Sequence, residues 1–459
     1  MLSRAYLRTW RENPLREILA GAVATFALIP EVIAFSYTAG VDPAVGLYAS
    51  FVISIVIAVF GGRPAMISAA AGSVALVVAP LVKEHGVEYL FAAGLLAGLF
   101  QIAFGFGRLA HVMRFVSASV KTGFVNALAI LIFSAQLPHI IGAGPLGYGL
   151  IALGVALIYL VPRLTTAIPA PLICVVVLIA LAAALGLDVP RVADLGALPA
   201  GLPQFALPDV PFDLALLQII FLPALAIAMV GLLESLMTAG LVDQRTSTGS
   251  DKNAEARGLG LANIAASLTG GIAGCGMIGQ TVSNVKYGGR GRLSTMAAGV
   301  LLLVFMVALR DIVGQVPVAA LVAIMVLVSV DTFDWGSLKR MRGTPWMSNL
   351  VMLATVAVTV VTHNLSYGVL VGVVLSGIFF AAKLSTSHSV TREGDTYRVE
   401  GPVFFASAEA FAAAFDPAGH SGHVVIDLRG AKLWDITAKA ALVEVQDRFT
   451  QAGLTVETL

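Results

Sequence analysis

The chain has 459 residues, of which 58% are hydrophobic, only 12% are charged and 46 are glycine. Such a balance lies far outside the range of water-soluble domains of this length, so most of the chain cannot be a soluble enzyme or binding module. The formal net charge of +1 says little about partners, and no nucleic-acid partner is expected.

Apolar stretches follow one another from about residue 16 to residue 386, each close to the roughly 17–25 residues that cross a hydrocarbon core. The sequence therefore predicts an all-α polytopic membrane protein with fourteen transmembrane segments. Ten clear crossings lie at 18–38, 44–60, 88–107, 118–136, 146–161, 171–186, 214–240, 291–309, 346–362 and 367–384. Four shorter or interrupted stretches lie at 65–82, 258–274, 275–286 and 317–330.

Basic residues are distributed unevenly between the segments that link these stretches. With fourteen spans and a cytoplasmic N-terminal segment at 1–15, the outer segments hold only Lys83, Arg191 and Arg310. Cytoplasmic segments of membrane proteins carry an excess of positive charge, so both termini are expected in the cytoplasm and the protein in the plasma (inner) membrane. The eighteen inner residues are Arg4, Arg8, Arg11, Arg16, Arg63, Arg108, Arg114, Arg163, Arg245, Lys252, Arg257, Lys286, Arg290, Arg292, Lys339, Arg340, Arg342 and Lys383.

Two carboxylates lie inside apolar stretches, where ionisable residues are rare and usually functional. Glu31 comes fifteen residues after Arg16, about 22 Å along a helix, and Pro30 before it removes a backbone hydrogen bond and exposes carbonyl groups. Glu234 shares a helix face with Thr238, a pair suited to hold a sodium ion or a transferable proton. Each carboxylate has a structural alternative as a buried contact between helices.

Two membrane segments begin with small residues that favour extended backbone. Residues 64–82 do so before a half-helix that starts near Gly72, and residues 270–286 do so before one that starts near Gly279 and Gln280. Paired interruptions of this kind point to an inverted repeat with a binding site at the membrane midplane. Helix N-termini attract anions, so an anionic substrate is expected between the two helix starts. A carboxylate beside that anion repels it unless it is protonated or paired with a cation, which favours coupling to H+ or Na+.

Four blocks of sequence resemble the sulfate permease family, also called solute carrier family 26, and they occur in family order. The blocks are ALIPEVIAFSYTAGVDPAVGLYASF from residue 27, GGRPAMISAAAGSVALV from residue 61, GLLESLMTAGLVDQRT from residue 231 and GCGMIGQTVSNVKYGGRGRLS from residue 274. The resemblance implies seven-plus-seven inverted repeats, here at about 16–187 and about 212–386. Spans 1–4 and 8–11 would form a mobile core domain with half-helices 3 and 10, and the other spans a gate. A homodimer and an elevator mechanism are implied as well.

The resemblance also implies roles for individual residues. Glu31 stands where many relatives have glutamine, and Phe35 is at a position that often lines the substrate pocket. Glu234 and Thr238 match positions at which sodium-coupled bicarbonate relatives bind the cation, while Gln280 stands where animal motor and channel members carry arginine. The expected ion-coupling residues are Glu31, Glu234 and Thr238. The expected substrate-binding residues are Glu31, Phe35, Ala71, Gly72, Ser73, Gly279, Gln280 and Thr281.

Residues 390–459 have the composition of a soluble domain and resemble the C-terminal STAS domain of the same family. Residues 397–459 read as strand, helix, strand, helix, strand. The last strand and helices usual in such domains are missing, so a small, truncated α/β domain on the cytoplasmic side is expected.

Two titratable carboxylates without an arginine favour a proton-coupled symporter of a dicarboxylate such as fumarate. The alternatives are a sodium-coupled bicarbonate or sulfate transporter, a passive anion exchanger or channel-like pathway, and a membrane scaffold regulated through the STAS domain.

No enzymatic activity, cofactor or metal is expected. His420 and His423 have no further ligands at a recognisable spacing, and Cys174 and Cys275 are expected to be packing residues in apolar stretches. The basic loop 286–292 lacks the spacing of a nucleotide-binding loop, and the charge asymmetry explains it.

Overall fold

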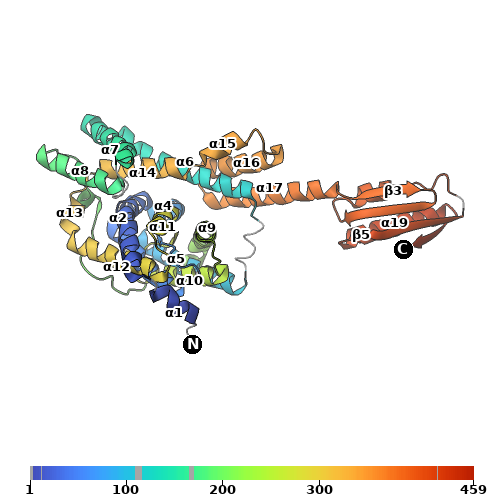
Figure 1. Ribbon diagram of the computed structural model, residues 1–459, viewed down its shortest axis with the longest axis horizontal. Coiled ribbons are helices and arrows are strands. Elements are labelled where there is room, and N and C mark those ends of the chain that lie inside the picture. Colours follow the sequence, from blue (N-terminus) through green and yellow to red (C-terminus); the bar gives the residue numbers. More distant parts are fainter. Residues whose placement is uncertain (1–3, 12, 109–115, 165–169, 421) are drawn as a thin grey trace. The chain divides into compact units, whose positions relative to one another are not determined.

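The computed structural model describes residues 4–11, 13–108, 116–164, 170–420 and 422–459, so Arg114 lies outside the described residues. Contacts divide the chain into two units, one made of Met1–Thr344 and Met352–Val371, the other of Pro345–Val351 and Gly372–Leu459. Figure 1 shows the ribbon of the chain with its helices and strands labelled.

Every predicted span corresponds to a helix within the described part of the chain. The long apolar helices are α2 (Pro14–Ala39), α3 (Pro43–Phe60), α5 (Val87–Phe106), α6 (Ala118–Ile141), α7 (Gly144–Leu164), α9 (Leu214–Thr246), α14 (Val318–Thr332) continuing into α15 (Trp335–Arg340), and α17 (Leu365–Ser385). Shorter apolar helices are α8 (Ala170–Ala184), α12 (Arg292–Ala308) and α16 (Trp346–Thr362). The remaining three are α4 (Gly72–His85), α10 (Lys252–Ser267) and α11 (Ile278–Lys286). Short elements outside the spans are α1 (Arg4–Arg11), η2 (Val192–Leu195) and α13 (Arg310–Gly314).

The span predicted at 258–274 begins six residues earlier, at Lys252. The carboxylate of Asp251 caps this helix by accepting hydrogen bonds from the backbone N–H groups of Asn253 and Ala254, at 3.0 and 2.9 Å. The charged residues of the first turns hid this start from a search for apolar residues. The helix ends at Ser267, and extended backbone follows.

Helix contacts in the first unit repeat with an offset of seven spans. α2 packs on α12, and its counterpart α9 packs on α5. α3 packs on α12, and its counterpart α10 packs on α5. α2 also packs on α11, as α9 does on α4. Equivalent helices therefore make equivalent contacts, which is the pattern of the predicted inverted repeat.

Two groups of helices make up most of this unit (Figure 1). α2, α3, α4, α5, α9, α10, α11 and α12 pack against one another and correspond to the predicted core domain. α6, α7, α8 and α14 pack against one another and correspond to spans 5, 6, 7 and 12 of the predicted gate. α14 and α8 contact α2 of the core group, and α6 contacts α4.

Buried polar contacts tie the loops together at one end of the core group. Arg63 and Lys252 both pair with Asp243, at 3.1 and 2.7 Å. The carboxylate of Glu17, near the start of α2, accepts a hydrogen bond of 2.9 Å from the backbone N–H of Gly291 at the start of α12. These charges are satisfied within the protein, which fixes the loops that connect the core helices.

The C-terminal part of the second unit is a four-stranded sheet in the order β3-β4-β5-β6. β3 (Ser389–Glu393) and β4 (Thr396–Val403) are antiparallel, whereas β5 (His423–Leu433) and β6 (Thr455–Thr458) lie parallel to their neighbours. α18 (Ala408–Ala413) and α19 (Ile436–Gln451) connect the parallel strands. The predicted order of strands and helices over 397–459 is confirmed, and β3 is an additional strand before it.

His420 is a structural residue. Its side chain is fully buried, with Nδ1 2.7 Å from the carboxylate of Asp395 and Nε2 3.0 Å from the hydroxyl of Tyr397. His423 lies on β5 and pairs with Glu457 at 3.1 Å. No group of three potential metal ligands occurs among the described residues.

The crossing of α5 and α10 depends on two glycines. A Cβ atom on Gly98 would lie 2.6 Å from the carbonyl oxygen of Gly260, and one on Gly260 would lie 2.5 Å from that of Gly98.

We predict that Gly98→Leu forces the helices apart and lowers the free energy of unfolding by at least about 1–3 kcal/mol, which thermal unfolding of the purified protein in detergent would detect. Gly149→Leu, at a helical glycine with open space around it, is the matched control. Equal unfolding temperatures for the two variants would contradict this account of the crossing.

Candidate functional site

The centre of the core domain is built from two short strands and the half-helices that follow them. β1 (Ser68–Ala70) leads through the extended residue Ala71 into α4, which starts at Gly72 as predicted. β2 (Gly274–Gly276) leads through Met277 into α11. The two strands pair antiparallel, with Ala69 opposite Cys275. The half-helix starts, far apart in sequence, are thereby held side by side.

Side chains from neighbouring helices satisfy the backbone of these strands. Ser50 accepts a hydrogen bond from the N–H of Ala70 at 3.1 Å, and Ser235 accepts one from the N–H of Gly276 at 2.8 Å. The side-chain oxygen of Asn263 accepts a hydrogen bond from the N–H of Gly274 at 2.8 Å. Unpaired backbone groups in a membrane interior are costly, so these contacts permit non-helical backbone at this depth.

Glu234 lies at the start of α4. Its carboxylate accepts hydrogen bonds from the hydroxyl of Ser73, the second residue of α4, and from the thiol of Cys275 at 3.1 Å. Cys275 is thus a partner of the carboxylate rather than only the packing residue that was expected. Both donors and the α4 N-terminus favour negative charge at this position.

Glu31 lies at the start of α11. Its carboxyl group interacts with the side chain of Gln280, the third residue of that helix. Nε2 of Gln280 is buried and makes no hydrogen bond of ordinary geometry to any described residue. Each half-helix therefore starts beside a glutamate of the opposite repeat, Glu234 for α4 and Glu31 for α11.

The two half-helix starts differ in how they are covered. A Cβ atom on Gly72 would lie 2.7 Å from the ring of Phe35, so this buried ring closes over the start of α4. A Cβ atom on Gly279 would meet nothing within 4 Å. The first N–H groups of a helix have no intrahelical acceptor, and at α11 they lie in the same turn as the open position of Gly279.

Two of the predicted site residues have hydroxyl groups engaged with backbone. The hydroxyl of Thr238 donates to the carbonyl oxygen of Gly276 at 3.0 Å, which leaves its lone pairs available to a cation. The hydroxyl of Thr281 accepts from the N–H of Ile67 at 2.9 Å and lies 3.3 Å from the carbonyl oxygen of the same residue. Thr281 thus ties α11 to the segment before β1.

Sequence reasoning missed two contributors to this region. Asp331, at the end of α14 in the gate group, is near enough to Glu31 for the two charges to interact. Asn263 lies on α10 and is held by Gln101 of α5 at 2.9 Å. Polar residues inside apolar stretches were the available signal for the Asn263–Gln101 pair.

Comparisons with known proteins agree with this architecture. The profile of the Sulfate permease family matches residues 15–148 and 145–355, and that of the STAS domain matches residues 388–457. YbaR of Bacillus subtilis (strain 168), whose name describes it provisionally as a sulfate transporter, is 50% identical over 98% of this chain and 95% of its own. The bicarbonate transporter BicA of Picosynechococcus is 27% identical over 93% of this chain and 85% of its own.

Two solved structures extend the comparison. The transmembrane domain of a cyanobacterial BicA is 26% identical and superposes with a TM-score of 0.71 over 79% of this chain and 98% of that domain. The murine anion transporter Slc26a9 in its inward-facing state superposes with a TM-score of 0.84 over 99% of this chain and 87% of its own. At 17% identity, the second likeness concerns the fold alone.

Thr281 and Gln280 should respond differently to substitution. Thr281→Val leaves the buried N–H of Ile67 without its acceptor, so we expect a loss of about 1–3 kcal/mol in unfolding free energy, with Thr281→Ser as the control that keeps the hydroxyl. Gln280→Ala removes an amide whose Nε2 makes no hydrogen bond of ordinary geometry within the described part of the chain, so we expect near-normal stability and about tenfold weaker anion binding. Thermal unfolding measures the stability of the variants, and calorimetric titration with sulfate and fumarate measures their anion affinity. Unchanged anion affinity in Gln280→Ala would exclude Gln280 from the site.

Proposed function

Since this chain belongs to the sulfate permease family, we propose that it is a secondary active transporter that carries a small anion across the membrane by an elevator movement of the core domain. The family and the relatives named above are transporters, and none of them is named as an enzyme. The observation that supports the anion site most directly is the open start of α11, where the side chain of Gln280 interacts with Glu31 and its buried Nε2 makes no hydrogen bond of ordinary geometry within the described residues.

The substrate in this proposal binds at the start of α11. The first N–H groups of the helix, the amide of Gln280 and the positive end of the helix dipole attract an anion there. The absence of a side chain at Gly279 lets the anion approach the backbone. An anion with several acceptor oxygens satisfies these donors, and our leading candidate is a dicarboxylate such as fumarate.

Proton coupling follows from the position of Glu31. A bound anion and an ionised carboxylate repel each other in a medium of low dielectric constant, so anion binding favours the protonated form of Glu31. Glu234 accepts hydrogen bonds from Ser73 and Cys275, whereas Glu31 interacts with the side chain of Gln280 at the proposed anion site. Glu31 is therefore the proposed carrier of the transported proton.

Sodium-coupled transport of bicarbonate or sulfate is the second candidate. Glu234 lies one helical turn before Thr238, whose hydroxyl oxygen keeps its lone pairs for a cation. The bicarbonate transporter BicA is among the relatives. In this case the sodium ion would bind at Glu234, next to the covered start of α4.

The remaining parts of the proposal concern assembly and location. We place the N-terminal segment 1–15 and the STAS domain, about 390–459, in the cytoplasm, because basic residues are concentrated in the segments on that side. The protein is proposed to be a homodimer in the plasma membrane.

Replacing Glu31 tests the coupling. In proteoliposomes with an imposed pH or sodium gradient, uptake of radiolabelled fumarate, sulfate and bicarbonate is measured for the wild type, Glu31→Gln and the control Glu84→Gln. Glu84 is an exposed acid near the end of α4. We expect uptake driven by the pH gradient in the wild type and in Glu84→Gln, and at least a tenfold loss of that uptake in Glu31→Gln, because glutamine cannot carry a proton.

Two outcomes of this experiment contradict the leading proposal. Sodium-dependent uptake that survives Glu31→Gln would assign the coupling to Glu234 and favour the second candidate. Flux that needs no gradient of either ion would contradict symport and indicate a passive pathway.

A further inference from the structure

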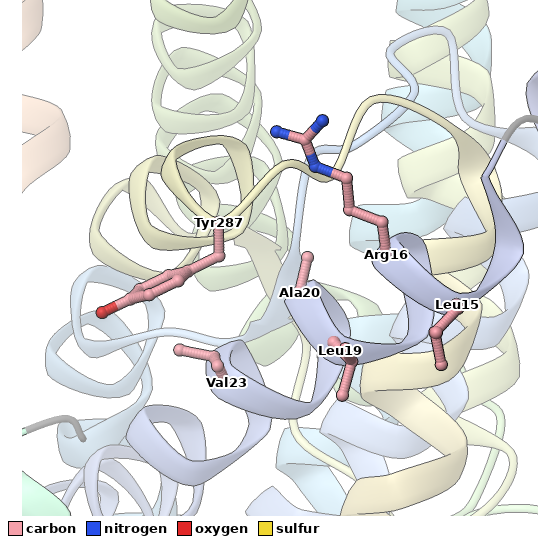
Figure 2. A pocket seen from close by; sticks show the side chains of 6 residues that line it. All are labelled: Leu15, Arg16, Leu19, Ala20, Val23 and Tyr287. Carbon is pink, nitrogen blue, oxygen red and sulfur yellow. The ribbon is translucent and has the colours of Figure 1, made fainter. Parts of the chain in front are cut away.

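A groove outside the proposed substrate site runs along the start of α2 beside the end of α11. Its volume is about 300 Å³, and Figure 2 shows the side chains that line it. Leu15 and Leu19 are 72% and 58% exposed, and Val23 continues the same wall one turn further along α2. Because α2 enters the membrane here, this apolar wall lies at the boundary between hydrocarbon and head groups.

One basic side chain, Arg16, lines the groove, and a second, Lys286, immediately precedes Tyr287 of the lining. The guanidinium group of Arg16 lies against the backbone of Gly288, where a Cβ atom would come within 1.9 Å of its Nε. In Figure 2, Arg16 and Tyr287 lie on either side of Ala20. The ammonium group of Lys286 is 5.8 Å from the centre of the Tyr287 ring. The two positive charges therefore come from different helices, Arg16 from α2 and Lys286 from the end of α11.

Neither cation has an acidic partner among the described residues. By contrast, Arg63 and Lys252 share Asp243, and the acid on α2 next to Arg16, Glu17, accepts backbone hydrogen bonds from Gly291. Arg16 and Lys286 form no such pair. The groove thus combines an apolar wall with positive charge that has no acidic partner within the described part of the chain. A small anion such as phosphate would neutralise the charge but would leave the apolar wall exposed.

We propose that the groove binds one anionic phospholipid, with its phosphate between Arg16 and Lys286 and an acyl chain along Leu19, Ala20 and Val23. Basic residues at a membrane surface attract anionic head groups, and the exposed leucines provide the apolar contact for the chain. α2 carries Glu31 and α11 carries Gln280. The lipid would therefore bridge the two helices that form the open half of the substrate site.

Native mass spectrometry of the full-length protein with dioleoylphosphatidylglycerol tests this site. Each basic residue near a membrane surface contributes about fivefold in affinity, so Arg16→Gln/Lys286→Gln should bind this lipid about 25-fold more weakly. Arg245→Gln is the matched control, because Arg245 is an exposed arginine at the end of α9 that lies outside the groove. Equal affinity of the double variant and the control would overturn the proposal.

Further binding measurements distinguish an anionic lipid from other ligands. Dioleoylphosphatidylcholine, with the same chains, should bind more weakly than phosphatidylglycerol, and inorganic phosphate should not compete with phosphatidylglycerol. Equal binding of the two lipids, or competition by phosphate, would overturn the assignment to an anionic lipid. Leu19→Gln keeps both cations and changes only the exposed wall, so it should weaken lipid binding even if the double variant does not fold. Unchanged lipid binding in Leu19→Gln would contradict the placement of the acyl chain.

Discussion

Non-helical backbone can lie within a membrane only if its N–H and carbonyl groups are hydrogen-bonded, and this constraint governs the centre of the core domain. β1 and β2 meet it by pairing with each other, while Ser50, Ser235 and Asn263 supply acceptors for their remaining N–H groups. Only because this backbone is satisfied can α4 and α11 begin inside the protein. Two helix N-termini, each with free N–H groups and positive potential, are then available at this depth.

The inverted repeat makes the two half-helices equivalent in backbone but not in surroundings. α4 starts beneath the ring of Phe35, with Ser73 bonded to Glu234, so its positive end is already matched by a carboxylate of the protein. α11 starts beside open space at Gly279, and the side chain of Gln280 there interacts with Glu31. The start of α4 is thus covered by protein groups, whereas the start of α11 is open at Gly279, where the proposed anion binds. In the proposed mechanism this difference separates anion binding from the internal carboxylate.

Much of this arrangement could be predicted from the sequence, since intramembrane carboxylates and runs of small residues are conspicuous among apolar residues. The start of α4 at Gly72 and the positions of Glu31 and Glu234 on long helices followed from that contrast. The partner of Cys275 did not, because a thiol in an apolar stretch looks like a packing residue and Glu234 is 41 positions away. The difference between the covered start of α4 and the open start of α11 could not be predicted from the sequence either, because it depends on where the Phe35 ring lies in three dimensions.

The central claim is that an anion and an ionised Glu31 cannot occupy the start of α11 together. Proton uptake on anion binding measures this directly, by calorimetric titration of the purified protein with fumarate or sulfate in buffers of different ionisation enthalpy. The account predicts uptake of about one proton for each anion bound at a pH where Glu31 is ionised in the free protein, because like charges in low dielectric disfavour joint ionisation. Anion binding of the same affinity with no proton uptake at any pH would contradict it.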